Sequence, residues 1–352
     1  MELQKFIDDN QTDYLNKFKN NNLFVKKHSQ LGLALIRLNK NTDYDFKENT
    51  WLRYCKGAII NLETNKLVCI PPEKSEGFID GDSVQEVVCQ PLIDGTMVNM
   101  FYHGDGWIIS TRSNIGGRNS WGDISFKEMF ESINGVKWYD ELDKGCCYSF
   151  ILQNTKNRIV TPVECDALFL IEVYNLKDDI KRLDVLPDFE NIHSINNLNH
   201  SDLEHYYNKD LYFSIKGFTL KTIDGRKNWI NKNYTYVLDL KVNFNNQFMN
   251  YISLKQQGKL SEYLVYFPED RYDFNDYDVR VINIKDKTYE NYVDVFIKKT
   301  KGLKDIAYSL KPVLYDIHGM YLKDKKNITV KKVNTFIDRL DGKKLLFIEK
   351  YL

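Results

Sequence analysis

Four short stretches of the chain gather basic, acidic and glycine residues of the kind that handle phosphate groups. They span residues 54–78, 90–116, 146–160 and 215–242. The second begins with Gln90-Pro-Leu-Ile-Asp-Gly-Thr96, a short strand that runs into an Asp-Gly turn. Leu92, two residues before this aspartate, has a hydrocarbon side chain, which cannot act as a nucleophile toward a phosphorus atom.

The elements that must position these residues change in type along the chain. Apolar residues at three- and four-residue steps predict helices at 2–20, 125–133 and 202–207. After about residue 250 helical spacing returns, and Pro312 is expected to kink or break one of these helices. Runs rich in β-branched and aromatic residues predict strands at 31–38, 56–62, 66–70, 85–93, 97–103, 106–112, 146–152, 167–175, 213–221 and 236–242. The pattern predicts an α+β chain with an antiparallel-sheet domain at 1–247 and a small all-helical domain at 248–352.

Composition restricts the class of protein. The 352 residues include 49 Lys plus Arg and 49 Asp plus Glu, so a nucleic-acid contact would have to be a local patch. The cysteines show no spacing typical of zinc sites or disulfide scaffolds, which predicts reduced thiols and no metal. The first 22 residues have no long apolar run, so we expect a soluble, cytoplasmic protein without a membrane span. Many residues have A/T-rich codons, which suggests a source such as a large DNA virus.

The order and local sequence of the four stretches resemble the phage-type RNA ligase 1 family. That family belongs to the covalent nucleotidyltransferase superfamily, together with DNA ligases and mRNA capping enzymes. Asn157-Arg158-Ile159-Val160 and Cys55-Lys56-Gly57 carry the most specific part of the resemblance, which covers residues 50 to 245. It implies a ligase-like domain, and the helical tail is loosely similar to the family's additional C-terminal domain.

The positions where this resemblance implies catalytic residues hold unsuited side chains. Leu92 stands in place of the lysine that attacks ATP, and Ile151 in place of a glutamate near the ribose and metal. Lys216 replaces the metal-binding glutamate, and its reversed charge would repel a cation. Asp239 replaces the first lysine of a Lys-x-Lys motif whose second lysine is Lys241. These losses affect one phosphoryl-transfer step, so they predict a chain without metal or nucleotide cofactor and without self-adenylylation.

Several charged residues are nevertheless candidates for binding a nucleotide or RNA. Simpler interpretations exist for some of them: a hairpin turn for Asp94, a structural ion pair for Arg158, and solvated surface charge for Lys216 and Lys241. The full candidate set is Lys56, Asp94, Arg112, Arg158, Lys216 and Lys241.

Three functions from different classes follow from these residues. The first is a catalytically inactive RNA-ligase-like protein that binds RNA or an mRNA-end nucleotide, or serves as a scaffold in mRNA capping or translation assemblies. The second is an active ATP-dependent RNA ligase or repair enzyme with a displaced nucleophile, for which Lys56 and Lys74 are the first candidates. The third is a scaffold that binds only protein partners, through its helical C-terminal part.

Overall fold

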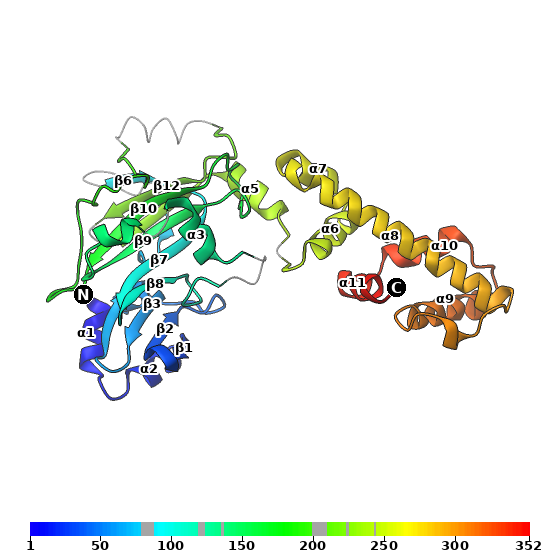
Figure 1. Ribbon diagram of the computed structural model, residues 1–352, viewed down its shortest axis with the longest axis horizontal. Helices are drawn as coiled ribbons and strands as arrows, with labels where there is room; N and C mark the ends of the chain where they lie inside the picture. Colours follow the sequence, from blue (N-terminus) through cyan, green and yellow to red (C-terminus); the bar gives the residue numbers. More distant parts are fainter. Residues whose placement is uncertain (79–87, 119–123, 135–136, 199–209, 223–224, 243) are drawn as a thin grey trace. The chain divides into compact units, whose positions relative to one another are not determined.

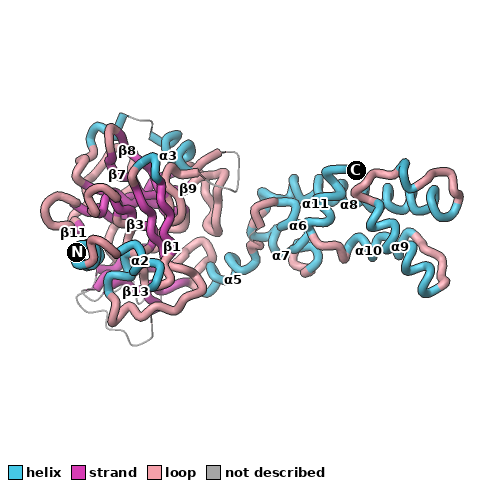
Figure 2. Tube along the Cα trace, turned by 90° about the horizontal axis from the view of Figure 1, so that it is seen from below, coloured by secondary structure: helices cyan, strands magenta, loops and turns pink. Residues whose placement is uncertain are grey.

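The computed structural model describes residues 1–78, 88–118, 124–134, 137–198, 210–222, 225–242 and 244–352. The chain divides into two compact units, Met1–Leu238 and Asp239–Leu352, whereas the sequence pattern suggested a division after residue 247. The α+β class predicted from the sequence is confirmed, with strands in the first unit and a helical C-terminal region (Figures 1 and 2). The helix predicted at 202–207 lies outside the described residues.

Within its described residues, the first unit forms three β-sheets whose strands pair mainly antiparallel. Their spatial orders are β1-β2-β3-β4, β11-β10-β9-β7-β8 and β5-β13-β12-β6, and β5 with β13 is a parallel pair. The strands are β1 (Phe24–His28), β2 (Leu33–Arg37), β3 (Lys56–Asn61), β4 (Lys66–Cys69), β5 (Glu76–Gly77), β6 (Val88–Pro91), β7 (Thr96–His103), β8 (Gly106–Ser110), β9 (Cys146–Gln153), β10 (Ala167–Asn175), β11 (Lys181–Arg182), β12 (Gly217–Thr222) and β13 (Gly225–Ile230). The helices are α1 (Glu2–Asp9), α2 (Tyr14–Asn20), α3 (Phe126–Asn134) and α5 (Lys232–Leu240), which continues two residues past the unit boundary, and 3-10 turns lie at Ser29–Leu31, Thr50–Tyr54 and Lys137–Glu141.

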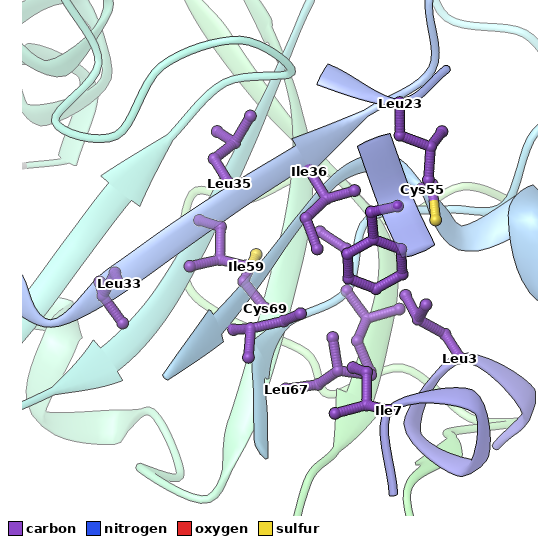
Figure 3. Close-up of a cluster of buried hydrophobic side chains, with 14 of the residues drawn as sticks. Leu3, Ile7, Leu23, Leu33, Leu35, Ile36, Cys55, Ile59, Leu67 and Cys69 are labelled. Carbon is purple, nitrogen blue, oxygen red and sulfur yellow. The ribbon is translucent and has the colours of Figure 1, made fainter. Parts of the chain in front are cut away.

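One hydrophobic core lies between the N-terminal helices and the sheet β1–β4. Leu3 and Ile7 of α1 point toward side chains of that sheet, among them Leu67 of β4 (Figure 3). All three are almost fully buried, and each such aliphatic side chain stabilises the fold by roughly 1.5–3 kcal/mol. A second core forms between α3 and the sheet that contains β9 and β10, where Phe130 packs edge-on against Phe150 with ring centres 5.3 Å apart. These two cores hold the sheets that carry the candidate site residues.

The structure corrects three local predictions in this unit. The strand predicted at 236–242 is wrong, because residues 232–240 form helix α5 and bury Tyr234, Val237 and Leu240 on one face. The N-terminal helix is two helices separated at residues 10–13. Strands β1, β5, β11 and β13 were not predicted, although β13 pairs along its whole length with β12, and β1 with β2.

In the described part of the second unit every regular element is helical. Pro312 lies in the first turn of α9 and therefore begins a helix, where its missing N–H costs nothing. No helix among the described residues is long and apolar enough to cross a membrane. The elements are α6 (Gln247–Gln256), α7 (Leu260–Tyr266), a 3-10 turn (Pro268–Asp270), α8 (Arg271–Tyr292) with a π-helical turn (Val293–Ile297), a 3-10 turn (Leu303–Asp305), α9 (Lys311–Asp324), α10 (Val330–Asp338) and α11 (Gly342–Tyr351).

Candidate functional site

Asp94, in the loop between β6 and β7, is the centre of a hydrogen-bond network in the first unit. One oxygen of its buried carboxylate accepts the backbone N–H groups of Val160 and Thr161, at 2.9 and 3.0 Å. The other accepts the Tyr234 hydroxyl at 2.6 Å and lies 3.3 Å from Lys216 Nζ. Burial alone would raise the pKa of Asp94, but the Lys216 charge, the Tyr234 hydroxyl and the two amides outweigh it and lower the pKa. The carboxylate therefore joins distant segments, and both its oxygens are occupied.

A pocket of about 230 Å³ lies beside this network and has a mainly aliphatic and aromatic lining. Leu92 lines it at the position where the resemblance implies the nucleophile, and its N–H donates to the Gly217 carbonyl at 2.9 Å. The remaining lining residues are Pro91, Ile93, Asp94, Gln153, Thr161, Phe169, Leu198, Ser214, Ile215, Lys216 and Gly217.

Ile151, the other hydrocarbon side chain at a position where the resemblance implies a catalytic residue, is not among the residues that line this pocket. It is buried on β9 and packs against the backbone of Gly95, where an added Cβ would lie only 2.6 Å from Ile151 Cγ2. The side chain thus contributes to packing in the sheet and offers no group that could bind ribose.

Lys56, at the start of β3, is a largely buried cation in a cationic environment. A Cβ on the next residue, Gly57, would lie 2.9 Å from Arg112 Cα, so glycine permits β3 to pass directly beside the Arg112 backbone. The pKa of Lys56 is lowered to about 8, mainly by burial and then by the charges of Arg226, Lys74, Arg112 and Lys216, in that order. Among the described residues, the Lys56 side chain makes no hydrogen bond or ion pair.

Two further basic residues, Arg226 and Lys221, surround the buried carboxylate of Glu172. Arg226 Nη1 lies 3.1 Å from Glu172 Oε2, and Lys221 Nζ lies 3.8 Å from the same oxygen. Burial lowers the pKa of Lys221 to about 8, although the Glu172 charge opposes that shift. These pairs connect β12 and β13 to β10 of a different sheet, and they leave Lys56 without a carboxylate of its own.

Arg226 is not among the residues predicted from the sequence, although it is the strongest charged neighbour of Lys56. The available signal was the run Asp224-Gly225-Arg226-Lys227, which comes shortly after the predicted strand at 213–221 and begins with a dipeptide typical of hairpin turns. The Arg226 side chain is 6% exposed, and its Nε has no hydrogen-bond partner among the described residues.

The structure places the other predicted residues as follows. Arg112 follows β8, and its buried Nε has no partner within the part of the chain that the structure describes. Burial and then the Arg37 charge lower the pKa of Arg112. Arg158 donates from Nε and Nη2 to the Val160 carbonyl, at 3.0 and 2.8 Å, and so shapes the loop that presents its amides to Asp94. Asp239 and Lys241 belong to the second unit, where Lys241 Nζ lies 5.3 Å from the centre of the Phe267 ring. Ligand binding by these residues stays a prediction.

The resemblance also implies a divalent metal, and the residues present do not fit one. Lys216 places an ammonium group beside Asp94, the acidic residue of the loop, and both oxygens of Asp94 already accept hydrogen bonds. Within the described ranges, no group of three or more His, Cys, Asp or Glu side chains could hold a metal ion. No metal-dependent step is therefore assigned to these residues.

Comparisons with known proteins place the chain only loosely. No family model matches the sequence, and no curated protein matches it. Among solved structures, the chain is similar to a protein described provisionally as an ATP-dependent DNA ligase from Aquifex aeolicus, with a TM-score of 0.44 and 12% sequence identity. The likeness covers 88% of this chain and 80% of that one. A likeness of this degree concerns the general course of the chain and does not assign a family.

Proposed function

We propose that the first unit is a nucleotidyltransferase-type domain that binds a phosphate-bearing nucleotide or RNA end and forms no lysyl-nucleotide at position 92. The observation that carries this proposal is the environment of Lys56. Its largely buried amine has four cations, Arg226, Lys74, Arg112 and Lys216, as its strongest charged neighbours, and no partner among the described residues. Uncompensated buried charge is costly, so such a centre indicates an anion that arrives from solution.

The apolar pocket beside Asp94 supports a nucleotide as the source of that anion. Lys216 lines the pocket and is also a charged neighbour of Lys56, so the pocket and the cationic centre adjoin. A nucleotide combines a flat, largely apolar base with phosphate oxygens that accept several N–H donors. Leu92 gives the pocket a hydrocarbon wall where a catalytic amine would be needed, which favours binding over covalent transfer.

Terminal phosphate recognition can be tested with two RNA oligomers that differ only at the 5′ end. We expect fluorescence anisotropy to show tighter binding of the 5′-phosphorylated oligomer than of the 5′-hydroxyl oligomer. Lys56→Gln and Arg112→Gln should each remove most of that difference, whereas Lys40→Gln, at an exposed loop position, should leave it unchanged. Equal affinity of the wild-type protein for both oligomers would contradict the proposal.

A second candidate, covalent nucleotidyl transfer by a displaced lysine, is favoured by one observation. The pKa of Lys56 is lowered to about 8, so a substantial fraction of its amine is unprotonated near neutral pH. In such a step the Lys56 nitrogen would form a bond to the α-phosphorus of ATP, the bond to the β-phosphate oxygen would break, pyrophosphate would leave, and solvent would take the amine proton.

Labelling with α-³²P ATP distinguishes the two candidates. A protein-bound label that survives denaturation in the wild type and is lost in Lys56→Arg would establish the enzyme, because arginine keeps the charge but not the nucleophile. Absence of label in the wild type, together with phosphate-dependent RNA binding, would support the binding protein alone.

A further inference from the structure

The charge of the helical second unit is divided between two parts of its sequence. Residues 260–294 contain nine Asp and Glu but four Lys and Arg, whereas residues 295–352 contain fourteen Lys and Arg but six Asp and Glu. The net charge therefore changes from −5 in the first part to +8 in the second. The net charge of the whole chain is zero and so does not reveal this basic segment, which includes α9, α10 and α11.

The few carboxylates of the basic segment are mostly occupied. Asp338 pairs with Lys285 at 2.7 Å, and Glu349 pairs with Arg280 at 3.1 Å, and both of these cations belong to α8. Asp341 accepts two backbone N–H groups as the N-cap of α11. In the described part of this unit, the cations of residues 295–352 form one ion pair, between Lys301 and Asp294. Their charge is thus available to a partner.

Three exposed aromatic rings lie together at α11. The Tyr308 ring meets the Phe347 ring edge-on at 5.3 Å between centres and lies 6.0 Å from the Tyr351 ring. Phe347 and Tyr351 are 5.1 Å apart, and the three residues are 60%, 39% and 46% exposed in chain order. Rings that contact one another and remain open to solvent offer a surface for stacking planar groups.

Lysines accompany these rings on the same exposed face of α11. Lys343, Phe347 and Lys350 follow one another at i, i+4 and i+7, and Lys344 precedes Tyr351 by seven residues. All five are exposed, while Leu345 and Ile348 between them are buried and anchor the helix. The helix therefore alternates positive charge with aromatic surface along one side.

We propose that this surface, defined by Tyr308, Lys343, Lys344, Phe347, Lys350 and Tyr351, binds single-stranded nucleic acid. Bases stack on the aromatic rings and backbone phosphates pair with the lysines, which is the combination that sequence-tolerant single-strand binding requires. The same surface of a second copy fits poorly because it would bring an equal positive charge. This surface is separate from the phosphate site of the first unit, and neither proposal depends on the other.

The test uses the full chain and a 15-nucleotide single strand with a 5′-hydroxyl end, as RNA and as DNA, followed by fluorescence anisotropy. Replacing both Phe347 and Tyr351 by alanine should weaken binding of the strand about ten- to a hundredfold. Tyr272→Ala is the matched control, because Tyr272 is 83% exposed but lies in the acidic part of the unit, and it should leave the affinity unchanged.

Charge variants provide a second measurement that does not depend on the rings. Lys343→Gln together with Lys350→Gln should reduce the slope of log affinity against log salt by about 1.4, since each phosphate contact of a single strand contributes about 0.7. Failure of the wild type to bind either strand at low salt, or equal binding by the aromatic double variant, would overturn the proposal. Stronger binding of an acidic peptide than of a strand with equal charge would also overturn it.

Discussion

Replacing Lys56 by methionine should stabilise the unliganded protein while it weakens binding of a phosphate ligand. The change keeps the approximate length of the side chain and removes a charge that the fold disfavours. Lowering the pKa from 10.5 to about 8 corresponds to ~3 kcal/mol of unfavourable free energy for the charged amine at neutral pH. Because other charges relax when one is removed, we expect a gain of about 1–3 kcal/mol in the free energy of unfolding.

The size and pH dependence of this effect are both measurable. At about 2–4 °C per kcal/mol for a unit of this size, the thermal midpoint should rise by about 2–12 °C. The folded-state pKa lies below the unfolded value, so the penalty is complete below pH 8 and decreases as the folded protein loses the proton first. The advantage of Lys56→Met should therefore be largest near pH 7 and vanish as the pH approaches 10.5.

The assay is urea unfolding at pH 7.0 and 9.5. The control is Lys40→Met, a change of the same kind at an exposed position. The reasoning is refuted if Lys56→Met lowers the stability of the free protein, or if its effect does not change with pH. Unchanged affinity for the 5′-phosphorylated oligomer would show that the amine does not contact the ligand.

Three more predictions concern the same unit. Binding of 5′-phosphorylated RNA should be accompanied by uptake of a proton at Lys56, so the affinity for this RNA should decrease as the pH rises through 8. Calorimetry in buffers of different ionisation heat should detect the proton uptake. Identical binding heats in all buffers would contradict this prediction. Asp94→Asn should destabilise the protein by about 2–4 kcal/mol at pH 7, because two amides, a hydroxyl and an ammonium lose their charged acceptor. Since the folded-state pKa of Asp94 is lowered, the difference in unfolding free energy between wild type and Asp94→Asn should have its full size above pH 3.8 and disappear at lower pH in urea titrations. An undiminished difference at low pH would argue against the hydrogen-bond network assigned to Asp94. Gly217→Ala should lower the free energy of unfolding by about 3 kcal/mol or more, because the φ of Gly217 is +141° and the new Cβ would lie 2.1 Å from the Trp229 carbonyl oxygen. Gly106→Ala is the control, since the space around Gly106 is open, and it should have little effect on the thermal midpoint.

Local sequence patterns predicted most of the strands because the apolar residues in these segments are the ones that the folded strands bury. Strands such as β2 and β9 are largely apolar runs between turn signals, and they are buried along nearly their whole length. The run at 236–242 failed because a short apolar segment is compatible with either period. Tertiary packing selected the helix, in which Tyr234 reaches Asp94.

The environment of the candidate site could not be predicted from the sequence. Lys56 was named as a candidate, but the groups that perturb it come from positions 74, 112, 216 and 226, and only the folded chain brings them together. Strand β13 was missed for a similar reason. Its Arg226 is polar enough to suggest a surface loop, and it is buried because Glu172, on a strand of another sheet, pairs with it. No local pattern contains that information.

The contact between Lys216 and Asp94 couples any change of charge at position 216 to the buried carboxylate at position 94. Lys216→Glu alone would remove the cation and place a second carboxylate near Asp94, and the two like charges would repel each other. Substitutions at the two positions are therefore expected to be non-additive, so a charge reversal at position 216 is tolerated only together with a change at position 94.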